Sequence, residues 1–188
     1  DAHLVFVTHS IPTAMNDTSG PSGGAYVTQH GAVVDLIVRT IAERTGRTHP
    51  HSLVYCSRSG APHVPWLEPD INDHLEHLAQ GGTTAVVVVP IGFVADHMEV
   101  IYDLDTEAKA TADRLGLVME RARTAGLDPR FVRVVRDLLV ERAAAERGEP
   151  VTRIAAEGLT VTSDLCAATC CPNPRQTLPA LGQADVTG

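Results

Sequence analysis

The sequence predicts an α/β domain built on a doubly wound, four-stranded parallel sheet. Short β-rich runs alternate with amphipathic helical segments along the first 148 residues. Strands that are separated by helices need crossover connections, and such connections make neighbouring strands parallel. The third β-rich run, Ala85 to Val89, shows no alternation of polar and apolar residues, as expected for a strand covered on both faces.

Start and stop signals divide the chain into elements. Gly46 ends the first long helix, and Asp128 with Pro129 begins the last. After Gly148 the composition becomes rich in Pro, Gly, Ser and Thr, so we expect one domain over 1–148 and a tail with little core over 149–188. The expected strands are Leu4 to Thr8, Ser52 to Cys56, Ala85 to Val89 and Leu117 to Arg121. The expected helices run from Gln29 to Arg44, from near Asp70 to Gly81-Gly82, onward from about Asp96, and from Phe131 to Arg147.

Composition excludes several classes of protein. The formal net charge is −8, which argues against nucleic acid as a partner because phosphates need a basic surface. The longest apolar run, Ala85 to Ala95, contains Pro90 and Gly92 and is too short to span a bilayer. No signal-peptide pattern is present, so a cytoplasmic location is expected. Three of the four cysteines cluster near the end, which favours a metal or cluster site over a disulfide scaffold.

Three separate stretches of the sequence place a histidine, a tryptophan and an acidic segment at one edge of the predicted sheet. Ligands of open α/β sheets bind beyond the carboxyl ends of the strands. His9 follows the first strand, Trp66 lies in the loop after the second, and an acidic segment that ends at Glu99 follows the third. The topology therefore predicts a binding site at this edge.

Glu99, Asp103 and Glu107 form an acidic ladder. Each four-residue step on an α-helix rotates only about 40° and climbs about 6 Å, so the three carboxylates share one face. A wider helical turn would align them further. Like charges at this spacing repel each other unless a cation is often present, and carboxylate with imidazole suits a borderline divalent ion such as Fe²⁺.

Simpler interpretations remain open from the residues alone. An acidic stripe on a helix is commonly a solvated face. A histidine after a strand is commonly a structural hydrogen-bonding group, and a tryptophan in a proline-flanked loop such as Trp66 commonly packs. Only the conjunction of these groups at one sheet edge favours a site, and composition does not name its substrate.

Three motifs resemble those of the ferrochelatase family. Phe6-Val-Thr-His-Ser-Ile-Pro12 is similar to the family's F-x-A-H-S-[LI]-P, and Val64-Pro-Trp-Leu-Glu-Pro69 is similar to its P-W-L-x-P loop. The segment from Pro90 to Glu107 resembles the ferrochelatase signature almost end to end. The resemblance runs from residue 3 to about residue 147.

The resemblance implies a role for each candidate site residue. Ferrochelatases insert Fe²⁺ into a porphyrin and release two protons. His9 would occupy the inner site as metal ligand or acceptor of pyrrole protons, and Glu99 would face it as metal ligand and base. Asp103 and Glu107 match outer positions that lead metal inward, and Trp66 would lie against the macrocycle. A neutral histidine and an ionised glutamate are required, so activity is expected to fall in acid.

The family resemblance also implies a substrate and a missing partner. The sequence is similar to those of actinobacterial members of the family. For these members the expected substrate is coproporphyrin III, which gives coproheme, and the alternative is protoporphyrin IX. Family members have two similar domains with the porphyrin cleft between them, and this chain begins at the second. The N-terminal domain is therefore the expected partner. Asp96 and His97 would be structural, setting the helix start and making a hydrogen bond behind the site.

Two other hypotheses stay beside this one. The first is a chelatase that inserts cobalt or nickel into a sirohydrochlorin-type ring as a dimer of single domains, which would explain the missing half. Such enzymes typically use two histidines in the inner site, and Glu99 is evidence against this hypothesis. A non-enzymatic metal- or haem-binding remnant is the other.

Some family members also hold a [2Fe–2S] cluster, for which Cys166, Cys170 and Cys171 resemble the C-terminal ligands. In such members the fourth ligand lies upstream of the inner histidine, so Cys56 is the one candidate left in this chain. We interpret Cys56 as a buried structural thiol and not as a ligand.

Overall fold

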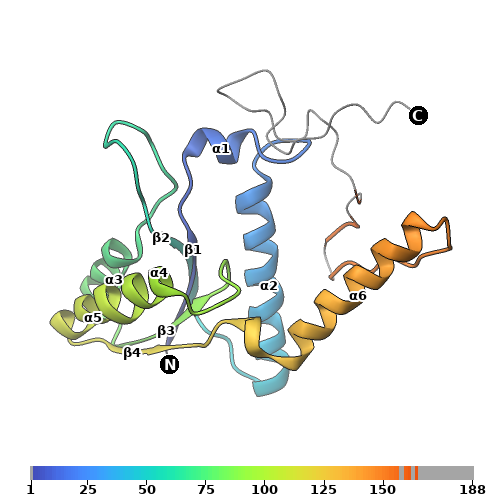
Figure 1. Ribbon diagram of the computed structural model, residues 1–188. Coiled ribbons are helices and arrows are strands. Elements are labelled where there is room, and N and C mark those ends of the chain that lie inside the picture. The colour runs from blue at the N-terminus through green and yellow to red at the C-terminus, as the bar shows by residue number, and fades with distance from the viewer. Residues whose placement is uncertain (1, 157–158, 162–163, 165–188) are drawn as a thin grey trace. The chain divides into compact units, whose positions relative to one another are not determined.

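The predicted sheet is present in the computed structural model, which describes residues 2–156, 159–161 and 164 (Figure 1). Its four strands lie in the order β2-β1-β3-β4. All three pairings are parallel, as predicted. The strands are β1 (His3–His9), β2 (His51–Cys56), β3 (Ala85–Pro90) and β4 (Val118–Arg121).

Helices connect the strands, and most follow the predicted signals. The helix predicted from Gln29 begins at Ala25, and the short helix Thr13–Asp17 was not predicted. Asp70 caps α3 by accepting a hydrogen bond from the Asn72 amide, and Gly46 adopts a positive φ of 68° after α2. The helix expected from about Asp96 consists of three consecutive pieces, the middle one a π-helix. The helices are α1 (Thr13–Asp17), α2 (Ala25–Thr45), α3 (Ile71–Gln80), α4 (Met98–Val100), the π-helix η1 (Ile101–Ala108), α5 (Lys109–Leu115), the 3₁₀-helix η2 (Ala125–Leu127) and α6 (Pro129–Glu146).

Each face of the sheet has its own apolar cluster. On one face, Phe6 and Leu4 pack with Val34 of α2. On the other face, side chains of α3, η1 and α5 cover the strands, with Leu75 and Leu104 fully buried. Helices on both faces define a doubly wound sheet. In β3, fully buried and half-buried residues alternate, so one face of this strand is covered less completely than the sequence predicts.

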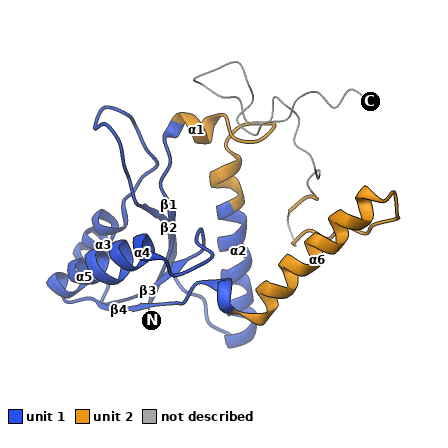
Figure 2. Cartoon of the chain, in the orientation of Figure 1, with its two compact units in different colours: residues 1–13, 30–127 blue, residues 14–29, 128–188 orange. Residues whose placement is uncertain are grey.

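Backbone contacts divide the chain into two units (Figure 2). The first comprises residues 1–13 and 30–127, and contains the sheet. The second comprises residues 14–29 and 128–188. Every predicted site residue apart from the three tail cysteines falls in the first unit, so the site can be described within that unit. The predicted boundary at residue 148 stays a prediction.

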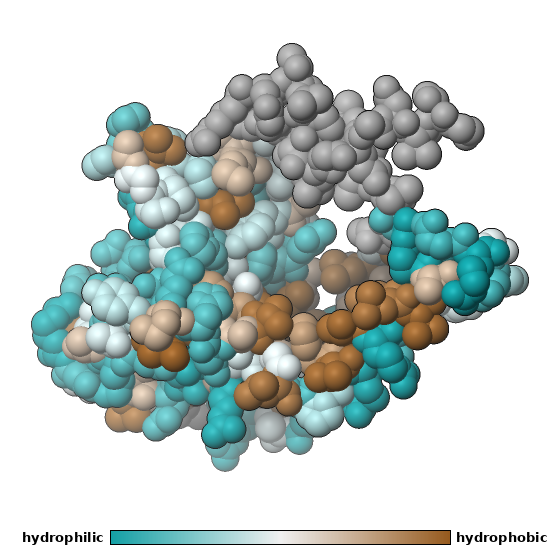
Figure 3. All heavy atoms as spheres, in the orientation of Figure 1, coloured by the Kyte–Doolittle hydropathy of each residue, from teal (hydrophilic) through white to brown (hydrophobic). Residues whose placement is uncertain are grey.

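In the second unit, α6 is amphipathic as predicted and exposes its apolar side chains (Figure 3). Asp128 caps its first turn by accepting a hydrogen bond from the Arg130 amide. No residue of α6 is buried. Its exposed large apolar side chains are Val132, Val134, Val135, Leu138, Leu139 and Val140. Within the described residues, no helix is both long and apolar enough to cross a membrane.

A close contact fixes the loop after β3 against β1. A Cβ built on Gly92 would lie 1.9 Å from the Thr8 Oγ1 atom and 2.6 Å from its Cβ atom. Thr8 is fully buried and its hydroxyl lies 3.0 Å from His30 Nε2, so it has little freedom to move aside. We expect Gly92→Ala to lower the free energy of unfolding by about 1–3 kcal/mol, measured by urea denaturation.

Gly31→Ala is the matched control for this substitution. Gly31 lies in α2, and a Cβ there would meet nothing within 4 Å. Alanine is the better helix former, so this variant should be equally or more stable than the parent. If both variants had the same unfolding free energy, the close approach at Gly92 would not constrain the fold.

Histidines cluster at the amino end of the sheet, away from His9. The Ser52 hydroxyl lies 3.0 Å from His3 Nε2 and 2.6 Å from His74 Nε2. Burial lowers the pKa of both rings below 6.5, and neighbouring histidines lower them further, His74 and His51 for His3 and His77 for His74. The folded chain therefore prefers both rings neutral.

This preference predicts that the fold weakens in mild acid. Because the folded-state pKa values lie below the unfolded value, the stabilisation is complete above pH 6.5 and is lost as the pH falls below it. The free energy of unfolding should decline from pH 7 to pH 5. A variant with His3→Gln and His74→Gln should show a shallower decline over that window, and an unchanged slope would contradict this account.

Candidate metal site at the carboxyl edge of the sheet

His9 and Glu99 face each other across the carboxyl edge of the sheet, as predicted. His9 is the last residue of β1, and Glu99 lies in α4, directly after the loop that follows β3. The His9 Nε2 atom lies 3.3 Å from the Glu99 Oε1 atom. Their side chains are 35% and 47% exposed, so an incoming ligand can reach both.

The backbone fixes which nitrogen of His9 points toward Glu99. His9 Nδ1 lies 2.5 Å from the carbonyl oxygen of Ser10. A carbonyl only accepts, so Nδ1 carries the proton and donates it to this bond. In the neutral ring Nε2 is then an acceptor, and so is the Glu99 carboxylate. Two acceptors 3.3 Å apart attract each other only through a shared positive species, either a proton or a metal ion.

The spacing of this pair matches two neighbouring ligands on one ion. Imidazole nitrogen and carboxylate oxygen bind a divalent ion of zinc's size at about 2.1 Å. Two such bonds at about 90–110° place the ligand atoms about 3.0–3.4 Å apart. The observed 3.3 Å lies within that range. Two protein ligands leave the remaining coordination positions of the ion open.

The helix that carries Glu99, Asp103 and Glu107 buries a parallel row of apolar residues, and this packing keeps the three carboxylates on one side of the helix. Val100, Leu104 and Ala108 are fully buried, at a spacing of four residues. Glu99, Asp103 and Glu107 each immediately precede one of these residues. A constant offset from a buried row means that the three carboxylates form a row of their own on one flank. The middle of this helix is π-helical over Ile101–Ala108, a form that is frequent at functional sites.

Asp103 is held by a group that the sequence did not indicate. The Ser57 hydroxyl donates a hydrogen bond to Asp103 Oδ2. Ser57 directly follows β2 and has a φ of 62°, the one positive φ of a residue other than glycine among the described residues. A left-handed backbone is costly for serine, and such strain clusters at functional sites. No sequence pattern marks Ser57, because the contact joins residues 46 positions apart.

Glu107 is exposed at the outer end of the row. Among the described residues no group of three or more His, Cys, Asp or Glu side chains is arranged to hold a metal ion. The structure thus brings His9 and Glu99 together, whereas Asp103 is hydrogen-bonded to Ser57 and Glu107 is exposed to solvent.

The backbone of Trp66 lies beside the segment that follows β1. Its residue pairs with Pro12 in an antiparallel bridge, and a Cβ on Gly60 would lie 3.5 Å from its ring. The residue is half-buried, and within the described part of the chain its indole N–H finds no acceptor. The structure places Trp66 next to the loop that follows His9. Contact with a macrocycle stays a prediction.

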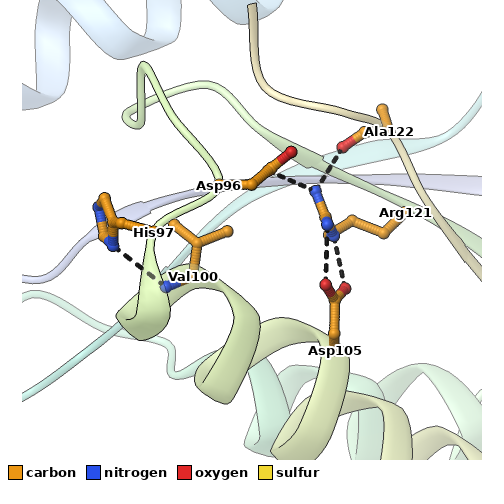
Figure 4. Close-up of polar contacts among 6 residues, drawn as sticks. All are labelled: Asp96, His97, Val100, Asp105, Arg121 and Ala122. Carbon is orange, nitrogen blue, oxygen red and sulfur yellow. Dashed lines mark hydrogen bonds and ion pairs between the residues drawn. The ribbon is translucent and has the colours of Figure 1, made fainter. Parts of the chain in front are cut away.

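Asp96 and His97 perform the two structural tasks that the sequence predicts for them (Figure 4). His97 caps α4, with Nδ1 accepting from the Val100 amide at 3.5 Å. Asp96 does not cap the helix. It accepts a hydrogen bond from Arg121 Nη1 at 2.8 Å. Sequence reasoning missed Arg121, because nothing in its local sequence marks a partner 25 residues away.

Cys56 is the buried structural thiol that the sequence indicates. It is 2% exposed, and its Sγ atom lies 3.8 Å from the Thr8 carbonyl oxygen. Burial raises its pKa to about 12. Cys56 lies within the hydrophobic core, where its thiol has no open side toward a cluster, so it does not fit the role of fourth ligand of an iron–sulfur cluster. The other three candidates, Cys166, Cys170 and Cys171, lie outside the described residues.

The fold and the site together define a class of protein: parallel α/β domains that present a histidine, a facing glutamate and a row of carboxylates at the carboxyl edge of the sheet. Residues 1–143 match the ferrochelatase family, and the chain belongs to that family. The resemblance expected from the three sequence motifs is therefore confirmed.

Several relatives carry the name coproporphyrin III ferrochelatase. The one from Streptomyces coelicolor is 57% identical in an alignment that covers 98% of this chain and 50% of the relative. The one from Frankia alni is 49% identical and matches 94% of this chain and 44% of the relative. The chain thus spans about half the length of the curated relatives it matches. A solved structure of a putative cobalamin biosynthesis CbiX protein from Marinobacter aquaeolei shares 14% identity at a TM-score of 0.46, over 77% of this chain and 99% of that one.

Proposed function

We propose that this chain is the metal-handling half of an enzyme that inserts Fe²⁺ into a porphyrin, and that coproporphyrin III is the porphyrin. The observation that carries this proposal is the pair of acceptors 3.3 Å apart, His9 Nε2 and Glu99 Oε1, in a chain of the ferrochelatase family. The substrate is taken from the relatives, whose names specify coproporphyrin III.

The reaction exchanges two pyrrole protons for one ferrous ion. Fe²⁺ and the free-base porphyrin give the iron porphyrin and two protons, with no change of oxidation state. A base within reach of the ring must accept each proton, and the facing pair of His9 and Glu99 supplies two acceptor atoms. His9 is held in the required tautomer by its bond to the Ser10 carbonyl group.

Fe²⁺ arrives as a hydrated cation and must lose water before it meets the pyrrole nitrogens. A row of carboxylates can replace that water step by step, since hard oxygen ligands at several weak positions bind without trapping. In this route Glu107 is the exposed entrance and Glu99 the inner end. Asp103 lies between them, and its hydrogen bond from Ser57 would be exchanged for the ion as it passes.

The other wall of the porphyrin cleft would come from a partner domain. The chain matches only about half of each relative, so the proposal needs a second domain equivalent to the other half of those proteins. The decisive experiment measures Fe²⁺ insertion anaerobically, by the loss of porphyrin fluorescence. The chain is assayed alone and joined behind the N-terminal half of the Streptomyces coelicolor relative.

The joined protein should metallate coproporphyrin III, with protoporphyrin IX as the comparison substrate. Preference for protoporphyrin IX would overturn the assigned substrate but not the reaction. Binding of metal or haem without insertion into either porphyrin would overturn the reaction and favour a non-enzymatic metal- or haem-binding role.

We also propose that Cys166, Cys170 and Cys171 contribute to a [2Fe–2S] cluster whose fourth ligand comes from outside this chain. The support is the clustering of three cysteines in a chain whose fourth, Cys56, is buried in the core. The joined protein, purified anaerobically, should show the visible absorption of such a cluster, and Cys56→Ser should leave that spectrum unchanged. A colourless protein would contradict the proposal.

A further inference from the structure

Arg121 joins three segments of the chain (Figure 4). It ends β4, and its side chain is only 15% exposed. Its Nε and Nη2 atoms donate to the two carboxylate oxygens of Asp105 in η1, at 2.5 and 2.8 Å. Its Nη1 atom donates to Asp96 at 2.8 Å and to the Ala122 carbonyl oxygen at 3.1 Å. The guanidinium thus binds one carboxylate in bidentate fashion and a second one beside it.

The two carboxylates bracket Glu99 along the chain. Asp96 precedes Glu99 by three residues, in the loop before α4, and Asp105 follows it by six, in η1. Arg121 therefore ties both the entry to this helix and its middle to the end of β4. Glu99 lies on the segment between the two attachment points.

The contacts of η1 also resist rotation of the helix about its axis. Successive residues are about 100° apart on an α-helix and somewhat less on a π-helix, so Asp103 and Asp105 lie on opposite flanks of the buried Leu104. Ser57 holds the Asp103 flank and Arg121 holds the Asp105 flank. A π-helix is rare in proteins and is seen mostly as single turns inside α-helices. The contacts of Asp103 and Asp105 lie on opposite sides of the buried Leu104. Together they oppose rotation of the π-helix into another register.

We propose that Arg121 is a positioning residue, which through Asp96 and Asp105 fixes the rotational setting of the helix so that Glu99 faces His9. The catalytic part of this inference rests on the proposed function. The positioning part concerns the chain alone. An arginine suits this task better than a lysine, because its planar fork can bind two carboxylates at once.

A matched control is available on the same unit. Arg114 Nη2 binds Glu76 Oε1 at 2.7 Å and joins α5 to α3. That pair is more exposed, at 58% and 44%, and joins one carboxylate only. Such surface pairs contribute little. Arg114→Gln therefore removes an arginine ion pair without affecting the proposed positioning.

The test measures Zn²⁺ binding and amide hydrogen exchange in the full 188-residue chain. Zn²⁺ stands in for Fe²⁺, and its binding is followed at the His9 ring by ¹⁵N nuclear magnetic resonance. We expect Arg121→Gln to weaken Zn²⁺ binding at His9 by about 10- to 100-fold, the usual effect of removing a group that orients a metal ligand. Amide exchange over 99–107 should become faster. Arg114→Gln should change neither.

Two further variants keep the inference falsifiable if Arg121→Gln does not fold. Asp105→Asn preserves shape and removes the bidentate carboxylate, and Arg121→Lys preserves charge and removes the fork. Both should weaken Zn²⁺ binding and speed exchange over 99–107. Unchanged Zn²⁺ affinity and unchanged exchange in the folded variants would overturn the inference. Faster exchange and weaker binding, in a protein that inserts no iron when joined to its other half, would support the positioning role and reject the proposed function.

Discussion

Glu99→Gln is expected to lower the rate of Fe²⁺ insertion by about 10²–10⁴-fold in the joined protein, the range that general acid–base catalysis contributes. Glutamine keeps the shape of the side chain but removes the charge and the base. The His9 Nε2 atom would then face an amide at 3.3 Å in place of a carboxylate, and no anion would complete the pair. The measurement is the initial rate of coproporphyrin III metallation under anaerobic conditions.

Glu120→Gln controls for the loss of one negative charge. Glu120 is exposed on β4 and plays no part in the row of carboxylates. Its substitution should leave the rate within about twofold of the parent, since exposed charges at a distance are screened by salt. Equal rates for the parent and Glu99→Gln would show that the carboxylate is neither ligand nor base.

Leu104→Ala is expected to lower the free energy of unfolding by about 2–5 kcal/mol, the range for leucine in a packed core. Leu104 is fully buried and belongs to the cluster under η1, between the two carboxylates that Ser57 and Arg121 hold. A loss of this size is large against a typical domain stability of about 5–15 kcal/mol. Urea denaturation at pH 7 gives the value.

Leu104→Met tests whether the destabilisation comes from the lost side-chain volume or from any change of residue at this position. Methionine nearly preserves the volume, so the cost should stay below about 1.5 kcal/mol. A small effect from Leu104→Ala would mean that η1 does not depend on its packing against the sheet, and the register argument for the ladder would lose its basis.

The periodic features of the sequence predicted the fold well. Each predicted strand is present within one or two residues, because apolar runs bounded by glycine and polar residues leave few alternatives. Asp70 and Asp128 cap their helices as their positions indicated. The π-helix could only be anticipated as an option, because one extra residue per turn leaves no mark in the sequence of a helix.

The site was predictable where topology alone brings residues together. His9 and Glu99 follow neighbouring strands β1 and β3, and parallel strands end at one edge. Ser57, Asp105 and Arg121 were not predictable, because their roles depend on side-chain contacts between residues 16–46 positions apart. Asp105 stands between two ladder residues and looks like part of the same acidic run, yet the helix turns it to the opposite flank.

The most direct test of the central claim is a Zn²⁺ titration of the chain with ¹⁵N-labelled histidine. The chain has nine histidines, and His9→Asn assigns the signal of interest. We expect Zn²⁺ to shift the His9 Nε2 resonance to a metal-bound position, and Glu99→Gln to weaken this shift. If Zn²⁺ moved other histidine signals and left His9 unchanged, the facing pair would not be the metal site of this protein.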